Sequence, residues 1–258
     1  MREAQVAVVK GEKPESMVRK ALSLIRAEKL VSPKDRVLIK PNYISALHPS
    51  TGVTTDPRVV EALIEFLEDR GVGDIVVGEG GAGDTERAFD VVEIRDVVAR
   101  HGVGLRDLND DERLMVRIPG ASALKEVGIA KTVMDRDCVI SVPSLKVHHL
   151  AVVTLCMKNL MGAVLPKSIM HSQLDEKLVD LASLIRPRLN VIDGIVGCEV
   201  DEVYGRPVRM GVVIAGEDMV AVDAVGAAVM GIDPGMVRHL QLAEERGLGV
   251  ADLSRIEV

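Results

Sequence analysis

Hydrophobic and polar positions follow two alternating patterns along this chain of 258 residues. Short apolar runs of strand-like composition are followed by longer segments in which apolar residues recur at helical spacing. Such alternation is typical of a mostly parallel sheet covered by helices. It predicts an α/β fold with Rossmann-like layers, built as a single α/β domain over residues 1–258, with two closely packed lobes as the alternative.

The predicted elements follow from this pattern. Strands are expected at 5–9, 36–39, 74–77, 138–142, 190–192 and 211–215, with shorter ones near Leu105 and Met115. Helices are expected at 15–30, 57–69, 86–100, 152–164, 172–185, 219–230 and 236–246, with a helical turn near Lys131. Asp56 before Pro57 is typical of a helix start, and the sequence 172–175 resembles a capping box. The continuous apolar run at 138–142 predicts a strand buried on both faces.

Composition narrows the function classes. The chain is 47% hydrophobic but only 2% aromatic, so its core must consist of Val, Leu, Ile, Ala and Met. A net charge of −7 with scattered basic residues argues against a nucleic-acid partner. The amino terminus has no apolar core of a signal peptide, and no run approaches the ~20 apolar residues of a membrane span. We expect a cytoplasmic protein with no membrane partner.

The three cysteines are Cys138, Cys156 and Cys198, and no two of them form a CxxC pair. This spacing disfavours a structural zinc site and a ferredoxin-type cluster, so an iron–sulfur cluster is not expected in this chain alone. Buried thiols are the expected outcome. A cluster shared between chains, or assembled by the three thiols in space, is the alternative.

The segment 141–171 is the most informative, because it places cations and imidazoles among apolar residues: Lys146, His148, His149, Lys158, Lys167 and His171. A lysine removed from water lowers its pKa or acquires a counter-charge, so such groups indicate a site more readily than scaffold. In an extended segment Lys146 and His148 share a face, while His149 points to the other.

Three further side chains stand in or beside predicted helices. Lys158 interrupts an apolar helix face, and we interpret its amine as facing a ligand or carrying it covalently; the alternative is that it reaches out to water. His171 precedes a helix and suits a neutral base or metal ligand, or is an ordinary surface histidine. Asp223 lies in a helix of small apolar residues, where we expect one of these lysines or histidines as its partner, or a helix-dipole role.

Other candidates lie at or just beyond predicted strand ends, where open α/β sheets bind ligands. Lys40, Glu79, Lys146 and Asp193 fall there, and Asn42 adds an amide to the same edge. Lys40 and Asp193 also fit the alternative of ordinary polar loop residues.

A glycine-rich loop follows the strand at 74–77. Gly78, Gly80 and Gly83 match the dinucleotide-binding spacing G-x-G-x-x-G, with Asp107 as the downstream acid. The motif does not open the first strand–helix unit, so we favour a cradle of backbone amides for phosphate or carboxylate, which includes Gly81.

Several short segments, taken in order, resemble the domain of unknown function 362 family, from about residue 37 to the C-terminus. They are IKPN at 39–42, TTDP at 54–57, LKVHH at 145–149, MKNLMGAV at 157–164, His171, IDG at 192–194, AVDAV at 221–225 and MGID at 230–233. That family has no generally established activity. Many members carry paired four-cysteine ferredoxin motifs, which implies a link to electron transfer, but those motifs are missing here.

A fainter similarity, over residues 140–195, is to the N-terminal part of nickel-dependent lactate racemase. That family has a histidine, a lysine carrying a covalent nickel pincer nucleotide, a proline and a further histidine in this order. His148 or His149, Lys158, Pro166 and His171 stand in comparable places, whereas 156–157 replace the glycine pair before the family's lysine. The resemblance implies a shared α/β scaffold with a lysine and histidine cleft.

The leading hypothesis is an enzyme, or a descendant of one, that acts on a small anionic molecule. Lys40, Lys146 and the glycine loop would hold carboxylate or phosphate, His148 and His171 would transfer protons, and Lys158 would anchor substrate or cofactor. The cofactor is unknown, and a metal ion or a covalently attached group are both candidates.

Two alternatives remain at this stage. The first is a non-catalytic binding module or redox-partner subunit that has lost its cluster domain and keeps the pocket to bind a metal or metabolite. The candidate protein partners are a second copy of this chain, in a homo-oligomer, or an electron-transfer partner. The second uses His148, His149 and His171 as ligands of a nickel or zinc ion.

Overall fold

A computed structural model describes residues 4–258. Its central sheet has the strand order β12-β1-β11-β10-β7-β2-β3-β4, with β8 and β9 attached beside β10. The strands are β1 (Ala4–Lys10), β2 (Arg36–Pro41), β3 (Asp74–Glu79), β4 (Gly104–Asp107), β7 (Cys138–Val142), β8 (Ser144–His148), β9 (Val152–Thr154), β10 (Leu189–Glu199), β11 (Arg206–Gly216) and β12 (Ile256–Glu257). Neighbours from β4 to β10 are parallel, and β11 is antiparallel to both β10 and β1. The predicted α/β fold with a mostly parallel sheet is confirmed.

Side chains point alternately to the two faces of the sheet along the central strands, and this divides the apolar residues between two cores. Leu38 of β2 and Val139 of β7 face one core, whereas Ile39 and Ile140 face the other. Successive side chains of a strand point to opposite faces, so each strand contributes to both layers. All five residues of β7 are buried, as the sequence predicted.

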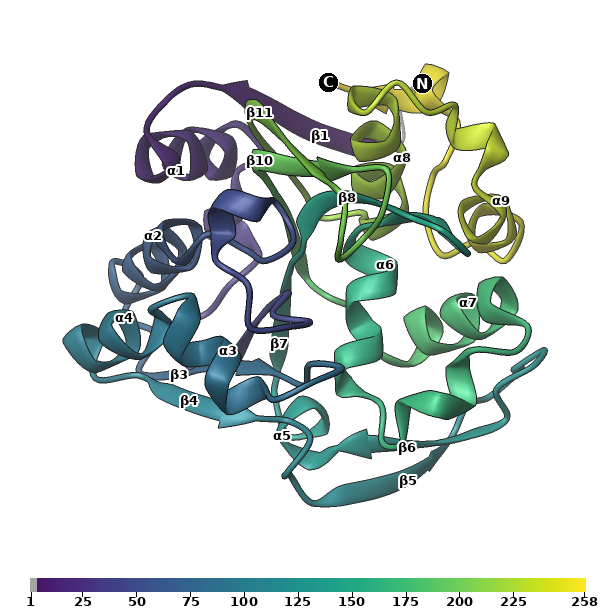
Figure 1. Cartoon of the computed structure of the whole chain (residues 1–258), viewed down its shortest axis with the longest axis horizontal. Helices are drawn as coiled ribbons and strands as arrows, with labels where there is room; N and C mark the ends of the chain where they lie inside the picture. The colour runs from purple at the N-terminus through teal and green to yellow at the C-terminus, as the bar shows by residue number, and fades with distance from the viewer. Residues whose placement is uncertain (1–3) are drawn as a thin grey trace.

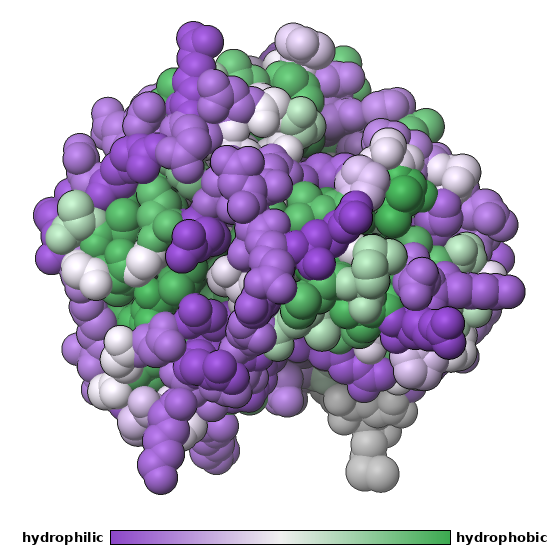
Figure 2. All heavy atoms as spheres, turned by 90° about the horizontal axis from the view of Figure 1, so that it is seen from below, coloured by the Kyte–Doolittle hydropathy of each residue, from purple (hydrophilic) through white to green (hydrophobic). Residues whose placement is uncertain are grey.

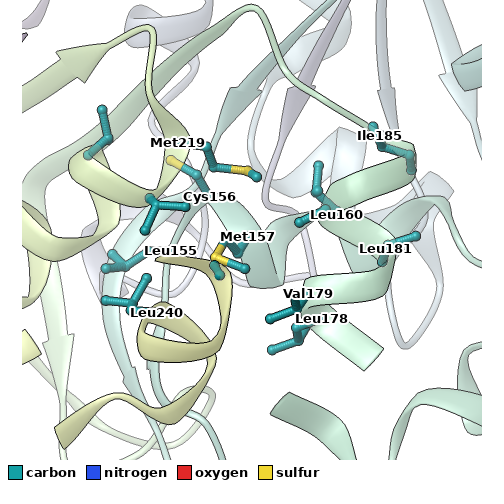
Figure 3. Close-up of a cluster of buried hydrophobic side chains, with 14 of the residues drawn as sticks. Leu155, Cys156, Met157, Leu160, Leu178, Val179, Leu181, Ile185, Met219 and Leu240 are labelled. Carbon is teal, nitrogen blue, oxygen red and sulfur yellow. The ribbon is translucent and has the colours of Figure 1, made fainter. Parts of the chain in front are cut away.

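Helices cover both faces of the sheet (Figure 1). One core packs under α1 (Pro14–Leu24), α2 (Pro57–Glu68), α3 (Thr85–Val91) and α4 (Ile94–His101). The other packs under α5 (Lys131–Met134), α6 (Cys156–Asn159), α7 (Leu174–Leu184), α8 (Met219–Val229) and α9 (Arg238–Glu245), together with the two-stranded sheet of β5 (Arg113–Arg117) and β6 (Glu126–Ala130). Figure 3 shows Met157 of α6, and Leu160 just after it, in one cluster of buried apolar side chains with Leu178, Met219 and Leu240.

Four predicted elements differ from the structure. The helix expected at 15–30 ends at Leu24, and a separate 3-10 turn follows at Ala27–Lys29. The expected helix at 152–164 is strand β9 followed by the short helix α6 and a 3-10 turn at Leu160–Ala163. The helix expected at 86–100 is divided into α3 and α4 at Glu93, whose φ is 61°. Gln173, rather than Ser172, precedes α7, and it makes no side-chain cap, so the predicted capping box is wrong.

Successive parallel strands are added first on one side of β2 and then on the other, and this reversal determines where the site lies. The chain runs from β2 outward to β3 and β4, then returns to the other side of β2 as β7 and continues to β10. A crevice forms outside the carboxyl ends of strands at such a reversal. No helix among residues 4–258 is long and apolar enough to cross a membrane.

Candidate functional site

A cleft of about 840 Å³ lies at the carboxyl ends of β2 and β3, bounded by β8, β9, α6 and the turn after β10. Eight of the sequence-predicted residues line it: Asn42, Glu79, Gly80, Gly81, His148, His149, Lys158 and His171. Five others lie outside its lining: Lys40, Gly78, Lys146, Asp193 and Asp223. The fold therefore brings most, but not all, of the predicted site residues together in one cleft.

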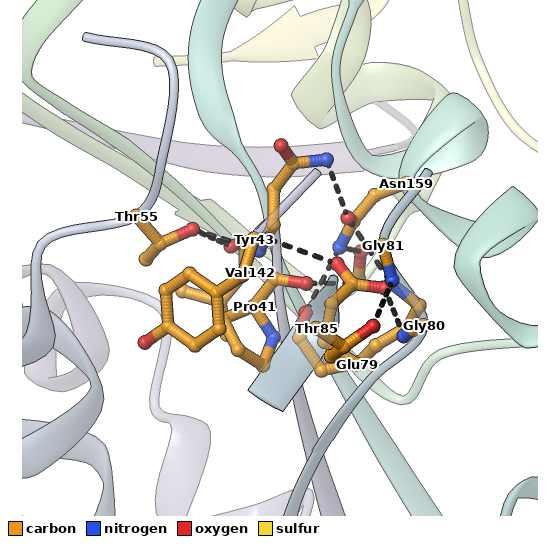
Figure 4. Close-up of polar contacts among 12 residues, drawn as sticks. Pro41, Tyr43, Thr55, Glu79, Gly80, Gly81, Thr85, Val142 and Asn159 are labelled. Carbon is orange, nitrogen blue, oxygen red and sulfur yellow. Dashed lines mark hydrogen bonds and ion pairs between the residues drawn. The ribbon is translucent and has the colours of Figure 1, made fainter. Parts of the chain in front are cut away.

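A buried ion pair forms the floor of this cleft. Lys40 Nζ lies 2.8 Å from Glu79 Oε1, and the two side chains are only 1% and 2% exposed. Glu79 also accepts hydrogen bonds from the backbone N–H groups of Tyr43 and Gly80, as Figure 4 shows. A buried charge pair is tolerated when such additional hydrogen bonds satisfy it. Burial lowers the pKa of Lys40, and Glu79 opposes that shift.

Asn159, at the end of α6, joins this floor to the neighbouring strands. Its Oδ1 accepts from Lys40 Nζ and from Asn42 Nδ2, both at 3.2 Å. Its Nδ2 donates to the Lys40 carbonyl and to Ser141 Oγ. All four hydrogen-bonding positions of the amide are thus used, and the position of α6 is fixed against β2 and β7.

Lys146 lies beneath the cleft in β8 and is completely buried. Its Nζ donates to Asn42 Oδ1 at 2.9 Å and to the Val53 carbonyl at 2.7 Å. Burial, with a smaller contribution from the charge of Lys158, lowers the pKa of Lys146 to about 7. Lys146 therefore orients Asn42 and does not reach a ligand directly.

Two further lysines line the cleft itself. The Lys158 amine has the Met161 thioether as its one hydrogen-bond partner within residues 4–258, at 3.6 Å. Burial lowers the pKa of Lys158 to about 8, while Glu202 acts in the opposite direction. Lys167 donates to Asn109 Oδ1, and burial lowers its pKa as well.

The two adjacent histidines share one carboxylate. Their rings stack with centroids 4.8 Å apart, and Glu202 Oε1 lies 3.4 Å from His148 Nε2 and 2.5 Å from His149 Nδ1. The chain turns after β8, so His149 does not point to the opposite face, and that prediction is wrong. Burial, followed by the charge of Lys158, lowers the pKa of His148 to about 3, so this ring is neutral.

The same three residues are the group within residues 4–258 whose ligand atoms could meet one metal ion, all within 4.8 Å of one another. His171, the third predicted ligand, is not in this group, and neither are the cysteines. His148 Nδ1 accepts the N–H groups of Leu150 and Ala151, so its proton sits on Nε2, the atom facing Glu202. A nitrogen that carries a proton does not bind a metal, so His148 fits poorly as a ligand.

The glycine loop offers fewer donors than expected. The amide N–H groups of Gly80 and Gly81 donate to Glu79 Oε1 and Thr85 Oγ1, and that of Ala82 to the Ile44 carbonyl. These three amides are already used, so they do not form the expected anion cradle. The glycines of the loop instead allow its backbone to approach another segment closely. A Cβ on Gly80 would lie 2.4 Å from the Gly162 carbonyl oxygen.

Asp193 and Asp223 organise backbone. Asp193 accepts the N–H groups of Asp56 and Ile195, and burial raises its pKa to about 7. Asp223 accepts those of Cys156 at 2.7 Å and Met157 at 2.9 Å, and burial raises its pKa to about 6. The expected lysine or histidine partner of Asp223 is therefore wrong, because its carboxylate holds the first turn of α6.

The family model "Domain of unknown function (DUF362)" matches residues 37–228. The chain belongs to this family. The curated "Thylakoid-associated protein sll1697" of Synechocystis sp. is similar to it, with 28% identity over 235 residues, 84% of this chain and 70% of that protein. The solved lactate racemase apoprotein from Thermoanaerobacterium thermosaccharolyticum is also similar, at 14% identity and a TM-score of 0.46. The match covers 95% of this DUF362 chain, which spans only 57% of the length of the racemase chain.

Sequence patterns assigned no role to several residues of the site in this DUF362 protein. Glu202 comes from the turn between β10 and β11, where no pattern marked it. Asn159 and Thr154 were visible as polar interruptions of the apolar run at 152–164, but carried no assigned role. Lys167 belonged to the cationic set of 141–171, and its position in the cleft follows from the turn at Lys167–Met170.

Proposed function

We propose that this protein binds a small anion, a carboxylate or phosphate, in the cleft, with Lys158 as its principal contact. The observation that carries the proposal is the state of the Lys158 amine. Lys40, Lys146 and Lys167 all donate to oxygen atoms of the protein, whereas Lys158 has only a thioether among the residues that the structure describes. A thioether is a weak acceptor, so the ammonium is left without a strong partner.

An anion would supply what this amine lacks. Desolvation is the leading cause of its lowered pKa, and an opposite charge within a few ångströms favours the charged form again. Thr154 Oγ1 supports the same conclusion, because it lines the cleft, is buried, and has no hydrogen-bond partner in the described chain. A ligand oxygen near Thr154 would satisfy a group whose isolation is otherwise costly.

Thermal-shift measurements with sulfate, phosphate and small carboxylates test this proposal, because a ligand that binds only the folded state raises the melting temperature. We expect an anion-dependent rise in the wild type that is lost in Lys158→Met. Lys125→Met is the matched control, because Lys125 is exposed and away from the cleft. An equal rise in the wild type and in Lys158→Met, or no rise with any of these anions, would refute the proposal.

The same free amine also suits covalent attachment of a group, which is the second candidate. Intact-mass analysis of freshly purified protein distinguishes the two. Covalent attachment predicts added mass on the peptide that contains Lys158, whereas reversible anion binding predicts the mass of the unmodified chain. Metal analysis of protein purified without a histidine tag tests the nickel or zinc alternative on the same sample.

A further inference from the structure

Glu202 contacts two of the three histidines that line the cleft, His148 and His149. It comes from the turn between β10 and β11 and is only 8% exposed. Burial raises its pKa, but hydrogen bonds from its own backbone N–H and from that of His149, together with the two neighbouring imidazoles, outweigh this effect, so the net shift is downward. Glu202 is therefore an anionic acceptor placed between the imidazoles.

This carboxylate determines which nitrogen of His149 carries the proton. Glu202 Oε1 lies 2.5 Å from His149 Nδ1, and its other oxygen accepts the His149 backbone N–H at 3.3 Å. A carboxylate accepts hydrogen bonds and does not donate them, so Nδ1 must be protonated. In the neutral ring the lone pair then lies on Nε2. The ring is 58% exposed and lines the cleft, so this nitrogen is accessible.

His148 has no such nitrogen. Its Nδ1 accepts the N–H groups of Leu150 and Ala151 at 3.0 and 3.2 Å, and its Nε2 faces Glu202 at 3.4 Å. Both ring nitrogens are engaged with protein groups. The sequence assigned proton transfer to His148 and His171, but of the two adjacent rings it is that of His149 whose contacts leave a basic nitrogen free.

We propose that His149 Nε2 is a proton acceptor for the ligand in the cleft, and that Glu202 is the positioning residue that fixes its tautomer. An acidic proton of the bound anion, or of a water beside it, would move to Nε2. The ring then becomes an imidazolium that keeps its Nδ1–H hydrogen bond to Glu202, and the ligand or water carries the electron pair. The inference rests on the proposed anion site only for the source of that proton.

Imidazole nitrogen NMR tests the tautomers directly. In protein labelled with ¹⁵N-histidine, long-range ¹H–¹⁵N correlations separate protonated from unprotonated ring nitrogens. We expect His149 with a protonated Nδ1 and His148 with a protonated Nε2, and His149→Gln assigns the signals. Glu202→Leu should remove the Nδ1–H preference of His149. A wild-type His149 protonated on Nε2 would overturn the proposal, and that measurement needs no variant to fold.

Acylation by diethyl pyrocarbonate, which attacks unprotonated ring nitrogen, tests access and position. We expect peptide mapping to show His149 modified well before His148, and phosphate to slow its modification. Equal rates at His148 and His149 would overturn the proposal. Phosphate that raises the melting temperature without protecting His149 would also overturn it. If phosphate neither stabilises nor protects but the tautomers are as expected, the anion site fails while the assignment of the basic nitrogen stands.

Discussion

Gly162 holds a position in the cleft that no larger residue fits. A Cβ there would lie 2.0 Å from Glu79 Oε1 and 2.6 Å from Lys40 Nζ. Both partners are buried and held by further hydrogen bonds, so neither can move aside cheaply. The backbone at Gly162 therefore closes over the ion pair only because it has no side chain.

Replacement of Gly162 by alanine should therefore displace the buried pair. We expect Gly162→Ala to lower the free energy of unfolding by about 1–3 kcal/mol, the usual range for overpacking a close-packed site. Gly83→Ala is the control, because a Cβ on Gly83 meets no atom within 4 Å. Urea denaturation measures both variants, and equal stability of the two would contradict the argument.

Individual residues show how far the sequence could predict this site. Lys158 was identifiable because a cation that interrupts an apolar run is conspicuous without a structure. The different roles of Lys146 and Lys158 were not, since they depend on Asn42 and Val53, which lie about a hundred positions before Lys146 in the chain. Glu202 is an acid in a turn, and its importance comes entirely from the histidines it contacts.

At the scale of elements, the short helix α6 depends on a neighbour. It has four residues, and the N–H groups of Cys156 and Met157 at its start are bound by Asp223 of α8. A helix this short is not stable alone, because nucleation outweighs the few hydrogen bonds it forms. Asp223 therefore places Lys158 and Asn159 in the cleft without touching it.

Loss of Asp223 should leave two buried amides without an acceptor. We expect Asp223→Ala to lower the free energy of unfolding by about 2–4 kcal/mol, since each unsatisfied buried donor costs about 1–3 kcal/mol. Asp110→Ala, at an exposed site, is the control and should change stability by less than about 0.5 kcal/mol. Chemical denaturation provides the comparison. A loss no greater than that of the control would show that α6 does not need this contact.

Helices and strands were predicted correctly where the sequence pattern is local, and wrongly where tertiary contacts determine the type of element. β2, β7 and α2 were predicted closely, because the strand pattern and the helix start at Asp56–Pro57 depend only on residues adjacent in the sequence. The apolar run at 152–164 matches a helix by periodicity, but β9 pairs with β8 and Asp223 starts α6 only at Cys156. Short apolar runs do not distinguish strand from helix.

At the scale of the whole molecule, the sign of the net charge opposes that of the cleft. The chain carries −7, and polar side chains predominate on the face shown in Figure 2. Four lysines lie in or under the cleft against the carboxylates of Glu79 and Glu202. A net negative charge repels an anion at long range, and salt screens that repulsion beyond about 10 Å. Attraction of an anion must therefore come from the lysines of the cleft itself. One sheet carries both cores, although the single domain over 1–258 stays a prediction.

Ligand-linked stability of the whole chain should depend on pH through Lys158. With a pKa of about 8 in the free protein, its amine is mostly charged near pH 7 and mostly neutral near pH 9. Because an anion binds the ammonium form, its affinity should fall about tenfold for each pH unit above the pKa. The rise in melting temperature caused by sulfate should therefore shrink between about pH 7 and pH 9.

Sulfate is the appropriate anion for this measurement, because its own charge does not change over that range. Lys158→Arg is the matched variant, since a guanidinium stays protonated at both values. It should keep the stabilisation by sulfate near pH 9 that the wild type loses. If the wild type keeps its full stabilisation near pH 9, or if Lys158→Arg loses it in parallel, the charge that holds the anion is not that of residue 158, and Lys167 becomes the contact to test.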